Sequence, residues 1–177
     1  MQPRRTFLKQ GLGLTAGLMS STFPGLSHNN ILSLKDIPIT DTHAHFWELD
    51  RLDYPWLEGK SSPISRDFVP DDYLQATKNY ALQRIVFVES GRVPEEYLQE
   101  TDWISQLAEH EDKIAGIVAF FPLEKGESVA SDLEKLAENT MVKGIRRMGD
   151  PTEMATSTPF LESLRLMNEH RMSLDIH

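Results

Sequence analysis

Short apolar strand patterns recur along this chain, and each is followed by a helical pattern. From the second strand onward they begin near Arg84, Ile114, Val142 and Ser173, which is one strand and one helix per roughly thirty residues. An earlier strand is expected over residues 37–43. Strands this apolar need cover on both faces, so the pattern predicts a parallel sheet flanked by helices.

Helix start signals fall between the predicted strands. Proline or an i, i+4 apolar stripe predicts helices over about 70–80, from Pro94 and around 129–137. Thr158-Pro159 predicts one more, with Thr158 as N-cap and proline in the first turn. Residues 46–68 are expected to form a long loop.

Two architectures satisfy this alternation. One is an open, doubly wound sheet, and the other is a (β/α)8 TIM barrel, which typically needs ~250 residues. The 177 residues hold strands for a little over half a barrel. In the barrel, the active site lies at the carboxyl ends of the strands.

The end of the first predicted strand carries two histidines, in His43-Ala44-His45. Side chains alternate between the faces of a strand, so Asp41, His43 and His45 are expected to point the same way. Imidazole nitrogens and carboxylate oxygens suit a divalent metal such as zinc. The alternative is a pair of solvated loop histidines beside a turn-forming aspartate.

The N-terminal residues 1–28 are typical of a twin-arginine-type export signal. Arg4-Arg5 precede a weakly apolar stretch over 11–23 that is too short for a membrane span. This predicts a periplasmic or secreted protein whose folded part is 29–177; the alternative is a basic terminus without a targeting role. The absence of cysteine excludes disulfides, thiolate ligands and a lipoprotein anchor.

Composition narrows the class of protein further. The net charge is −9, hydrophobic residues make up 40%, and lysines and arginines are scattered. This is typical of an acidic soluble domain, so we expect no nucleic-acid partner and no membrane span in the mature form. The folded part is long enough for one core.

Two segments together resemble a known family. The run Asp41 to Trp47 (DTHAHFW), followed by Asp53 to Leu57 (DYPWL), closely resembles the opening of the amidohydrolase-related family. The nearest branch holds sugar-lactone hydrolases, such as those acting on L-fuconolactone and L-rhamnonolactone. Weaker matches follow at 86–89, 114–118, 142–146 and 160–176, so the resemblance covers nearly everything after the signal.

The resemblance implies a TIM barrel, truncated after about four and a half βα units. It implies a hydrolase that opens a sugar lactone or related cyclic ester by attack of water on the carbonyl, with a small-molecule substrate. In the superfamily the first-strand histidines bind a divalent metal, so His43 and His45 become expected catalytic residues and metal ligands. Zinc is the metal we expect, although some lactone-hydrolysing relatives work without a required metal.

Three other residues gain candidate roles. The resemblance places Arg146 facing the pocket, where a guanidinium could clamp a substrate carboxylate or a lactone oxygen; the alternative is an ion pair at the rim. His177 lies where a fifth-strand metal ligand could lie, or has no role. Glu89 ends the second strand and could be the hydrogen-bond partner of a histidine.

The chain departs from the family in its extent. Strands six to eight are missing, together with the later histidine and the aspartate that the resemblance places there. We therefore expect this chain to be a fragment of a longer protein and inactive as a lactonase by itself. A non-catalytic polypeptide is one alternative. A metal-dependent phosphoesterase on a similar barrel is another, which the Phe46-Trp47 match disfavours.

Overall fold

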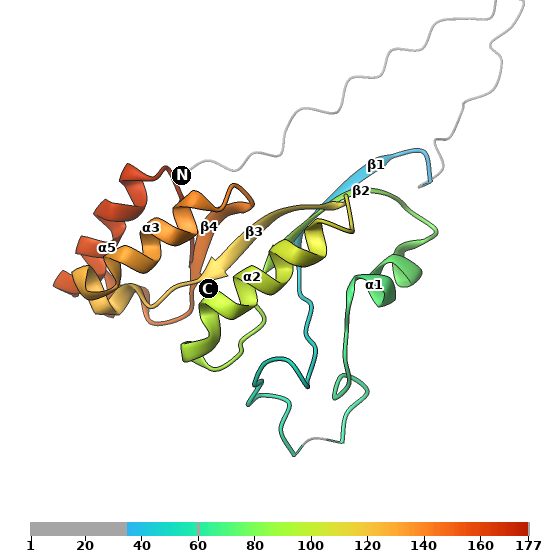
Figure 1. Ribbon diagram of the computed structural model, residues 1–177, viewed down its shortest axis with the longest axis horizontal. Coiled ribbons are helices and arrows are strands. Elements are labelled where there is room, and N and C mark those ends of the chain that lie inside the picture. Colours follow the sequence, from blue (N-terminus) through green and yellow to red (C-terminus); the bar gives the residue numbers. More distant parts are fainter. Residues whose placement is uncertain (1–34, 60, 177) are drawn as a thin grey trace, which may run out of the picture. The chain divides into compact units, whose positions relative to one another are not determined.

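The chain forms a sheet of five parallel strands that curls into half of a barrel. The computed structural model describes residues 35–59 and 61–176, so the predicted signal over 1–28 and His177 lie outside the described residues. The strands are β1 (Pro38–Ala44), β2 (Ala81–Val88), β3 (Ile114–Phe120), β4 (Val142–Arg147) and β5 (Ser173–Ile176). Each pairs in parallel with the next strand in sequence (Figure 1).

This strand order decides between the two predicted architectures. A doubly wound sheet reverses its strand order at a switch point, whereas the order here is β1-β2-β3-β4-β5. Sequential parallel strands joined by helices are the arrangement of a βα barrel. The prediction of a truncated TIM barrel is confirmed.

Helices follow the strands where proline and apolar periodicity predict them. They are α1 (Pro70–Thr77), the 3₁₀ turn η1 (Pro94–Glu96) with α2 (Tyr97–Ala108), the 3₁₀ turn η2 (Leu123–Val129) with α3 (Ala130–Glu138), α4 (Pro151–Thr156) and α5 (Thr158–Glu169). One predicted cap is wrong. The N-cap of α5 is Ser157, whose side chain accepts from the Phe160 amide, because α5 begins one residue earlier than expected.

The core lies between the helices and one face of the sheet. Phe87 and Ile117 are register partners on β2 and β3, and both are completely buried. Val86 and Val118, which alternate with them, are only half-buried. Burying each large apolar side chain contributes about 1.5–3 kcal/mol, so the helix-covered face supplies most of the stability.

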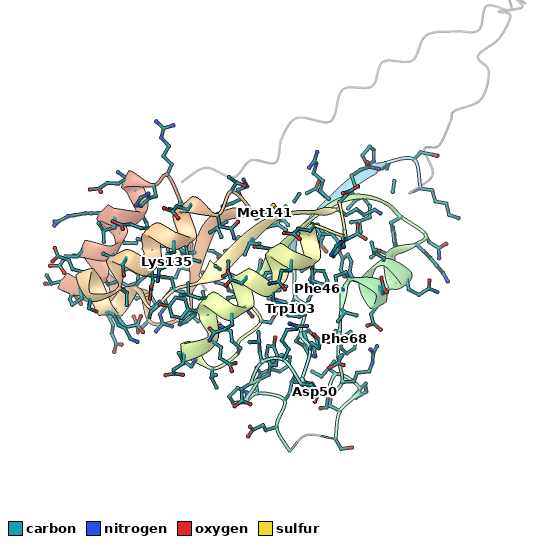
Figure 2. The ribbon with its side chains drawn as sticks, in the orientation of Figure 1. Phe46, Asp50, Phe68, Trp103, Lys135 and Met141 are labelled. Atoms are coloured by element: carbon teal, nitrogen blue, oxygen red, sulfur yellow. The ribbon has the colours of Figure 1, made fainter. Side chains whose placement is uncertain are left out.

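The long loop between β1 and α1 is folded back on itself. Trp47 and Phe68 exchange two backbone hydrogen bonds of 2.9 Å, which close the loop at its base. Figure 2 labels Asp50 and Phe68 in this loop. Inside it Leu52, Tyr54 and Leu57 are buried. The loop is thus an ordered part of the barrel rim. None of the helices in the described ranges has the length and apolar character needed to cross a membrane.

A glycine at the β4–β5 pairing gives a sharp test of the register. A β carbon on Gly144 would clash with Ser173 Oγ and would lie 2.7 Å from the Ser173 carbonyl oxygen. We expect Gly144→Ala to lower the unfolding free energy by about 1–3 kcal/mol, measured by urea denaturation. Ser173→Ala should not rescue it, because the carbonyl remains.

Gly116 on β3 is the matched control. Its nearest contact would be Lys143 Cγ at 3.1 Å, part of a flexible side chain, and the nearest backbone atom is 3.8 Å away. Gly116→Ala should therefore be tolerated far better than Gly144→Ala. Equal unfolding midpoints for the two variants would contradict the pairing of β4 with β5.

Candidate active site

Three of the residues predicted from sequence meet at the carboxyl ends of the strands. Arg146, on β4, places Nη1 3.1 Å from Nε2 of His43, on β1, although 103 positions separate them in the chain. The ring centroids of His43 and His45 are 4.9 Å apart, with planes at 78°. The structure thus assembles two imidazoles and a guanidinium where a barrel carries its active site.

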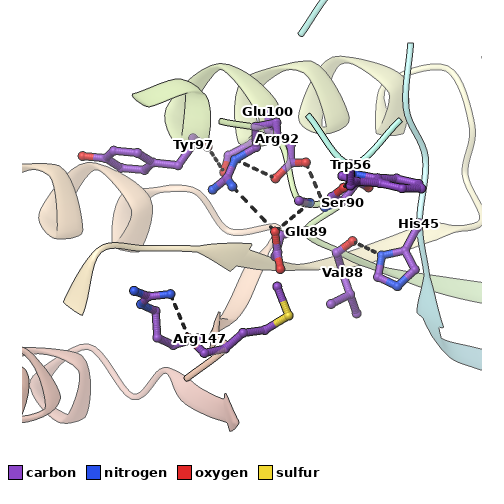
Figure 3. A network of polar contacts seen from close by, with 12 residues as sticks. His45, Trp56, Val88, Glu89, Ser90, Arg92, Tyr97, Glu100 and Arg147 are labelled. Carbon is purple, nitrogen blue, oxygen red and sulfur yellow. Dashed lines mark hydrogen bonds and ion pairs between the residues drawn. The ribbon is translucent and has the colours of Figure 1, made fainter. Parts of the chain in front are cut away.

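The ring of His45 is oriented by the neighbouring strand. Its Nδ1 lies 2.9 Å from the Val88 carbonyl oxygen at the end of β2 (Figure 3). Since a carbonyl only accepts, the hydrogen of neutral His45 is on Nδ1, and Nε2 keeps its lone pair. Burial lowers the pKa of His45, and the nearby His43 and Arg146 lower it further. His45 is therefore neutral at pH 7 and can accept a proton.

The Arg146 guanidinium is buried and only partly hydrogen-bonded. The residue is only 7% exposed, and its Nε has no hydrogen-bond partner. Its nearest carboxylate oxygen, Oδ2 of Asp175 on β5, is 4.0 Å from that Nε. Because arginine only donates, His43 Nε2 accepts from Nη1. A guanidinium is permanently charged and has several N–H donors in one plane, so it suits an anionic or carbonyl oxygen of a ligand.

Asp41 does not join the two histidines, and that expectation from strand alternation is wrong. The register of β1 against β2 shifts between Asp41 and Ala44, which breaks the alternation. The Asp41 carboxylate accepts from the Tyr73 hydroxyl on α1 and from the His43 amide at 2.9 Å. It therefore bonds to the helix layer and to its own strand, and it positions backbone.

The described donor set does not fit a zinc ion. Zinc in proteins takes three or four protein ligands, and the described ranges contain no group of three or more histidine, aspartate or glutamate side chains arranged to hold a metal. One of the two imidazoles also bonds to the Arg146 cation. The predicted third ligand, His177, lies outside the described residues.

A buried charged cluster lies at the carboxyl end of β2, and the sequence pattern indicates only one of its members, Glu89. Glu89, Arg92 and Glu100 have side chains at most 3% exposed. Arg92 Nη1 is 3.6 Å from Glu89 Oε2, and Arg92 Nε is 3.5 Å from Glu100 Oε2 (Figure 3). Glu89 also accepts from the Gly91 amide at 2.9 Å. Its described partners are thus Gly91 and Arg92, not the histidine that we expected.

Arg147 points away from this site, as strand alternation predicts. Its guanidinium makes two bonds of 2.9 and 3.0 Å to Glu124. The two residues line a hollow of about 270 Å³ that also contains Asp150 and Glu153. Three carboxylates with one paired arginine make this hollow a poor site for an acidic ligand.

The titration of Glu100 predicts an unusual pH dependence of stability. Burial raises the pKa of Glu100 from 4.5 to about 7, against the opposing influence of Arg92 and the Ser90 amide. The folded state then binds the proton more tightly than the unfolded state. This stabilisation is fully present below pH 4.5 and is lost as the pH rises through about 7.

We expect Glu100→Gln to remove this loss of stability between about pH 5 and pH 8, measured by urea unfolding at each pH. Asp102→Asn is the control, because Asp102 is exposed on the same helix. It should keep the wild-type slope. The pKa of His45 is lowered in the folded state, so its contribution to stability is lost as the pH falls below its ordinary pKa of 6.5. This effect is the same in the wild type and in both variants. A wild-type slope equal to that of Glu100→Gln would contradict the burial of a titrating Glu100.

The comparisons with known proteins concern the family and the fold. The sequence matches the amidohydrolase family over residues 40–177. It is 30% identical over 110 residues to an L-fucono-1,5-lactonase of Burkholderia multivorans, a match that covers 60% of this chain and 34% of that enzyme.

Solved structures share the fold. A zinc-bound amidohydrolase of Burkholderia multivorans superposes with a TM-score of 0.60 at 25% identity, over 77% of this chain and 47% of that one. A probable 2-pyrone-4,6-dicarboxylic acid hydrolase of Acinetobacter baumannii, with citric acid bound, superposes with a TM-score of 0.57 at 14% identity. This match covers 78% of this chain and 48% of that one. This chain spans about half the length of these structures. With its sequential parallel strands and the family match over residues 40–177, the chain belongs to the amidohydrolase family.

Proposed function

We propose that this chain supplies the β1–β5 half of a hydrolase site that opens a sugar lactone or a related cyclic ester. The observation that carries the proposal is the contact of Arg146 with His43, beside the neutral His45. The similarity to an L-fucono-1,5-lactonase supports the substrate class. The zinc of a structural relative is a property of that protein.

The geometry supports water attack on the lactone carbonyl. Arg146 donates to the carbonyl oxygen, where negative charge builds as the oxygen of water bonds to carbon. His45 accepts a proton from the attacking water at Nε2, the nitrogen that keeps its lone pair. The ring C–O bond then breaks, and the proton passes to the departing alkoxide. The product is a hydroxy acid whose carboxylate remains next to Arg146.

His43 has a supporting task in this scheme. By accepting from Arg146 Nη1 at 3.1 Å, it fixes one end of the guanidinium. The remaining N–H groups of the same planar guanidinium can then donate to the ligand in a fixed direction. A fixed guanidinium loses less conformational freedom when the substrate binds.

The proposal predicts which arginine binds the product. We expect L-fuconate, the hydrolysis product of the relative's named substrate class, to shift the imidazole signals of His43 and His45 in histidine-labelled protein. Arg146→Ala should weaken this binding about tenfold or more, the effect of losing a charge-assisted hydrogen bond. The measurement is an NMR titration of the imidazole resonances.

Arg147→Ala is the control for this titration, since Arg147 lies on the same strand and is paired with Glu124. Its affinity for L-fuconate should match that of the wild type. Equal binding by the Arg146→Ala variant, or a wild-type protein whose histidine signals do not respond, would contradict the proposed site.

A further inference from the structure

The turn after β2 holds the segment that follows β1. The Val88 carbonyl accepts from His45 Nδ1 at 2.9 Å. Two positions later, Ser90 Oγ donates to the Phe46 carbonyl at 2.7 Å. The Ser90 carbonyl in turn accepts from the Trp56 indole at 2.8 Å (Figure 3). The orientation of His45 therefore depends on where this turn lies.

The turn is itself held by buried carboxylates. The Glu89 amide still bonds to β3, donating to the Val118 carbonyl at 2.9 Å. The next two amides donate to side chains: Ser90 to Glu100 Oε1 at 3.0 Å, and Gly91 to Glu89 Oε2 at 2.9 Å. Glu100, from α2, thus takes the place of a strand partner at the point where the sheet ends.

Arg92 allows these carboxylates to be buried. Its guanidinium lies within 3.6 Å of both glutamates and 4.1 Å from the centroid of the Phe120 ring. A buried ionic cluster of this kind is a weak source of net stability, because desolvation offsets the attraction. Its best-attested use is to specify one local arrangement, here that of the turn beside His45.

We propose that Glu100 is a positioning residue for His45: by binding the Ser90 amide it fixes the Val88 carbonyl, which holds the hydrogen of His45 on Nδ1 and leaves the lone pair on Nε2. The inference rests on the proposed function, in which His45 accepts a proton at Nε2. Glu100 lies outside the pocket, yet on this inference it determines which ring nitrogen of His45 can accept a proton.

The test reads the histidine ring directly. In ¹⁵N-histidine protein near pH 8, where the ring is neutral, the nitrogen shifts report which nitrogen carries the hydrogen. We expect His45 to be in the Nδ1–H form in the wild type and in the Asp102→Asn control. Glu100→Ala should convert it to a mixture dominated by the Nε2–H form that free imidazole prefers. Exchange of the Ser90 amide should accelerate about tenfold or more.

Glu100→Gln is the rescue, because its amide oxygen can still accept from Ser90, and the Nδ1–H form should persist. If Glu100→Ala does not fold, Glu100→Asp serves in its place, since a side chain one methylene shorter withdraws the carboxylate from Ser90. A folded Glu100→Ala or Glu100→Asp protein with His45 still in the Nδ1–H form overturns the inference.

This readout separates the two proposals. An unchanged tautomer together with L-fuconate binding that needs Arg146 removes the role of Glu100 and keeps the proposed function. If the His45 tautomer changes in Glu100→Ala but the protein does not bind L-fuconate, the role of Glu100 stands and the proposed function is removed.

Discussion

Arg92→Ala is expected to lower the unfolding free energy by about 3–5 kcal/mol, the cost of removing one partner from a buried ionic pair. The arginine side chain is 1% exposed and lies between Glu89 and Glu100, which are equally buried. Without it, Glu89 loses its buried counter-charge, and Glu100, whose pKa burial raises and Arg92 lowers, takes up a proton more readily. Urea denaturation monitored by circular dichroism near pH 7.5 measures the loss.

Arg147→Ala provides the comparison. Arg147 also lies over the Phe120 ring, at 5.2 Å against 4.1 Å for Arg92, and it also pairs with a glutamate. Its side chain and that of Glu124 are 24% and 46% exposed, however. An exposed pair contributes at most about 1 kcal/mol. If Arg92→Ala costs no more than Arg147→Ala, the cluster at the carboxyl end of β2 is not buried as the structure shows.

Phe46→Ala, as a separate variant, is expected to lower the unfolding free energy by about 3–5 kcal/mol, as for other buried phenylalanines. Phe46 is 1% exposed, stacks on Phe87 with centroids 5.9 Å apart and meets the Tyr73 ring edge-on. It directly follows His45, so the cavity should also broaden the His45 ring signals. Thermal and urea unfolding give the stability change.

Phe46→Leu keeps most of the buried volume and should cost less than about 1.5 kcal/mol. It should leave the His45 signals sharp, because the Phe46 carbonyl still accepts from Ser90. A Phe46→Ala protein as stable as Phe46→Leu would show that this ring does not anchor the end of β1.

Much of the fold could be predicted because its signals are local. Apolar runs at Ile114 and Val142 and the proline at 94 mark their elements within a residue or two. The short helix α4 was not predicted, although Asp150 caps it by accepting from the Thr152 amide. A helix of one or two turns carries too few residues for periodicity to show.

The site was predictable only in part. The proximity of His43, His45 and Arg146 could be expected, because strand ends gather at one rim and because the first segment resembles a family. Asp41 was misplaced because a register shift depends on how β1 pairs with β2, which strand alternation ignores. Nothing local indicates that Glu100 binds the amide of Ser90.

A weak signal for Glu100 did exist. It lies three residues after Tyr97 and four before Ile104, so helical periodicity places an acid on the buried stripe of α2. A buried acid requires partners. The partners of Glu100 are Ser90 and Arg92, and they become known only from the folded structure.

The central claim is that His43, His45 and Arg146 form one ligand site at the barrel rim. A crystal structure of the protein soaked with L-fuconate tests it most directly. We expect the carboxylate within about 3 Å of the Arg146 guanidinium, a hydrogen-bond distance, with His45 Nε2 facing the same ligand. L-Fuconate bound only in the hollow beside Arg147 and Asp150, or imidazoles turned outward and apart from Arg146, would contradict it.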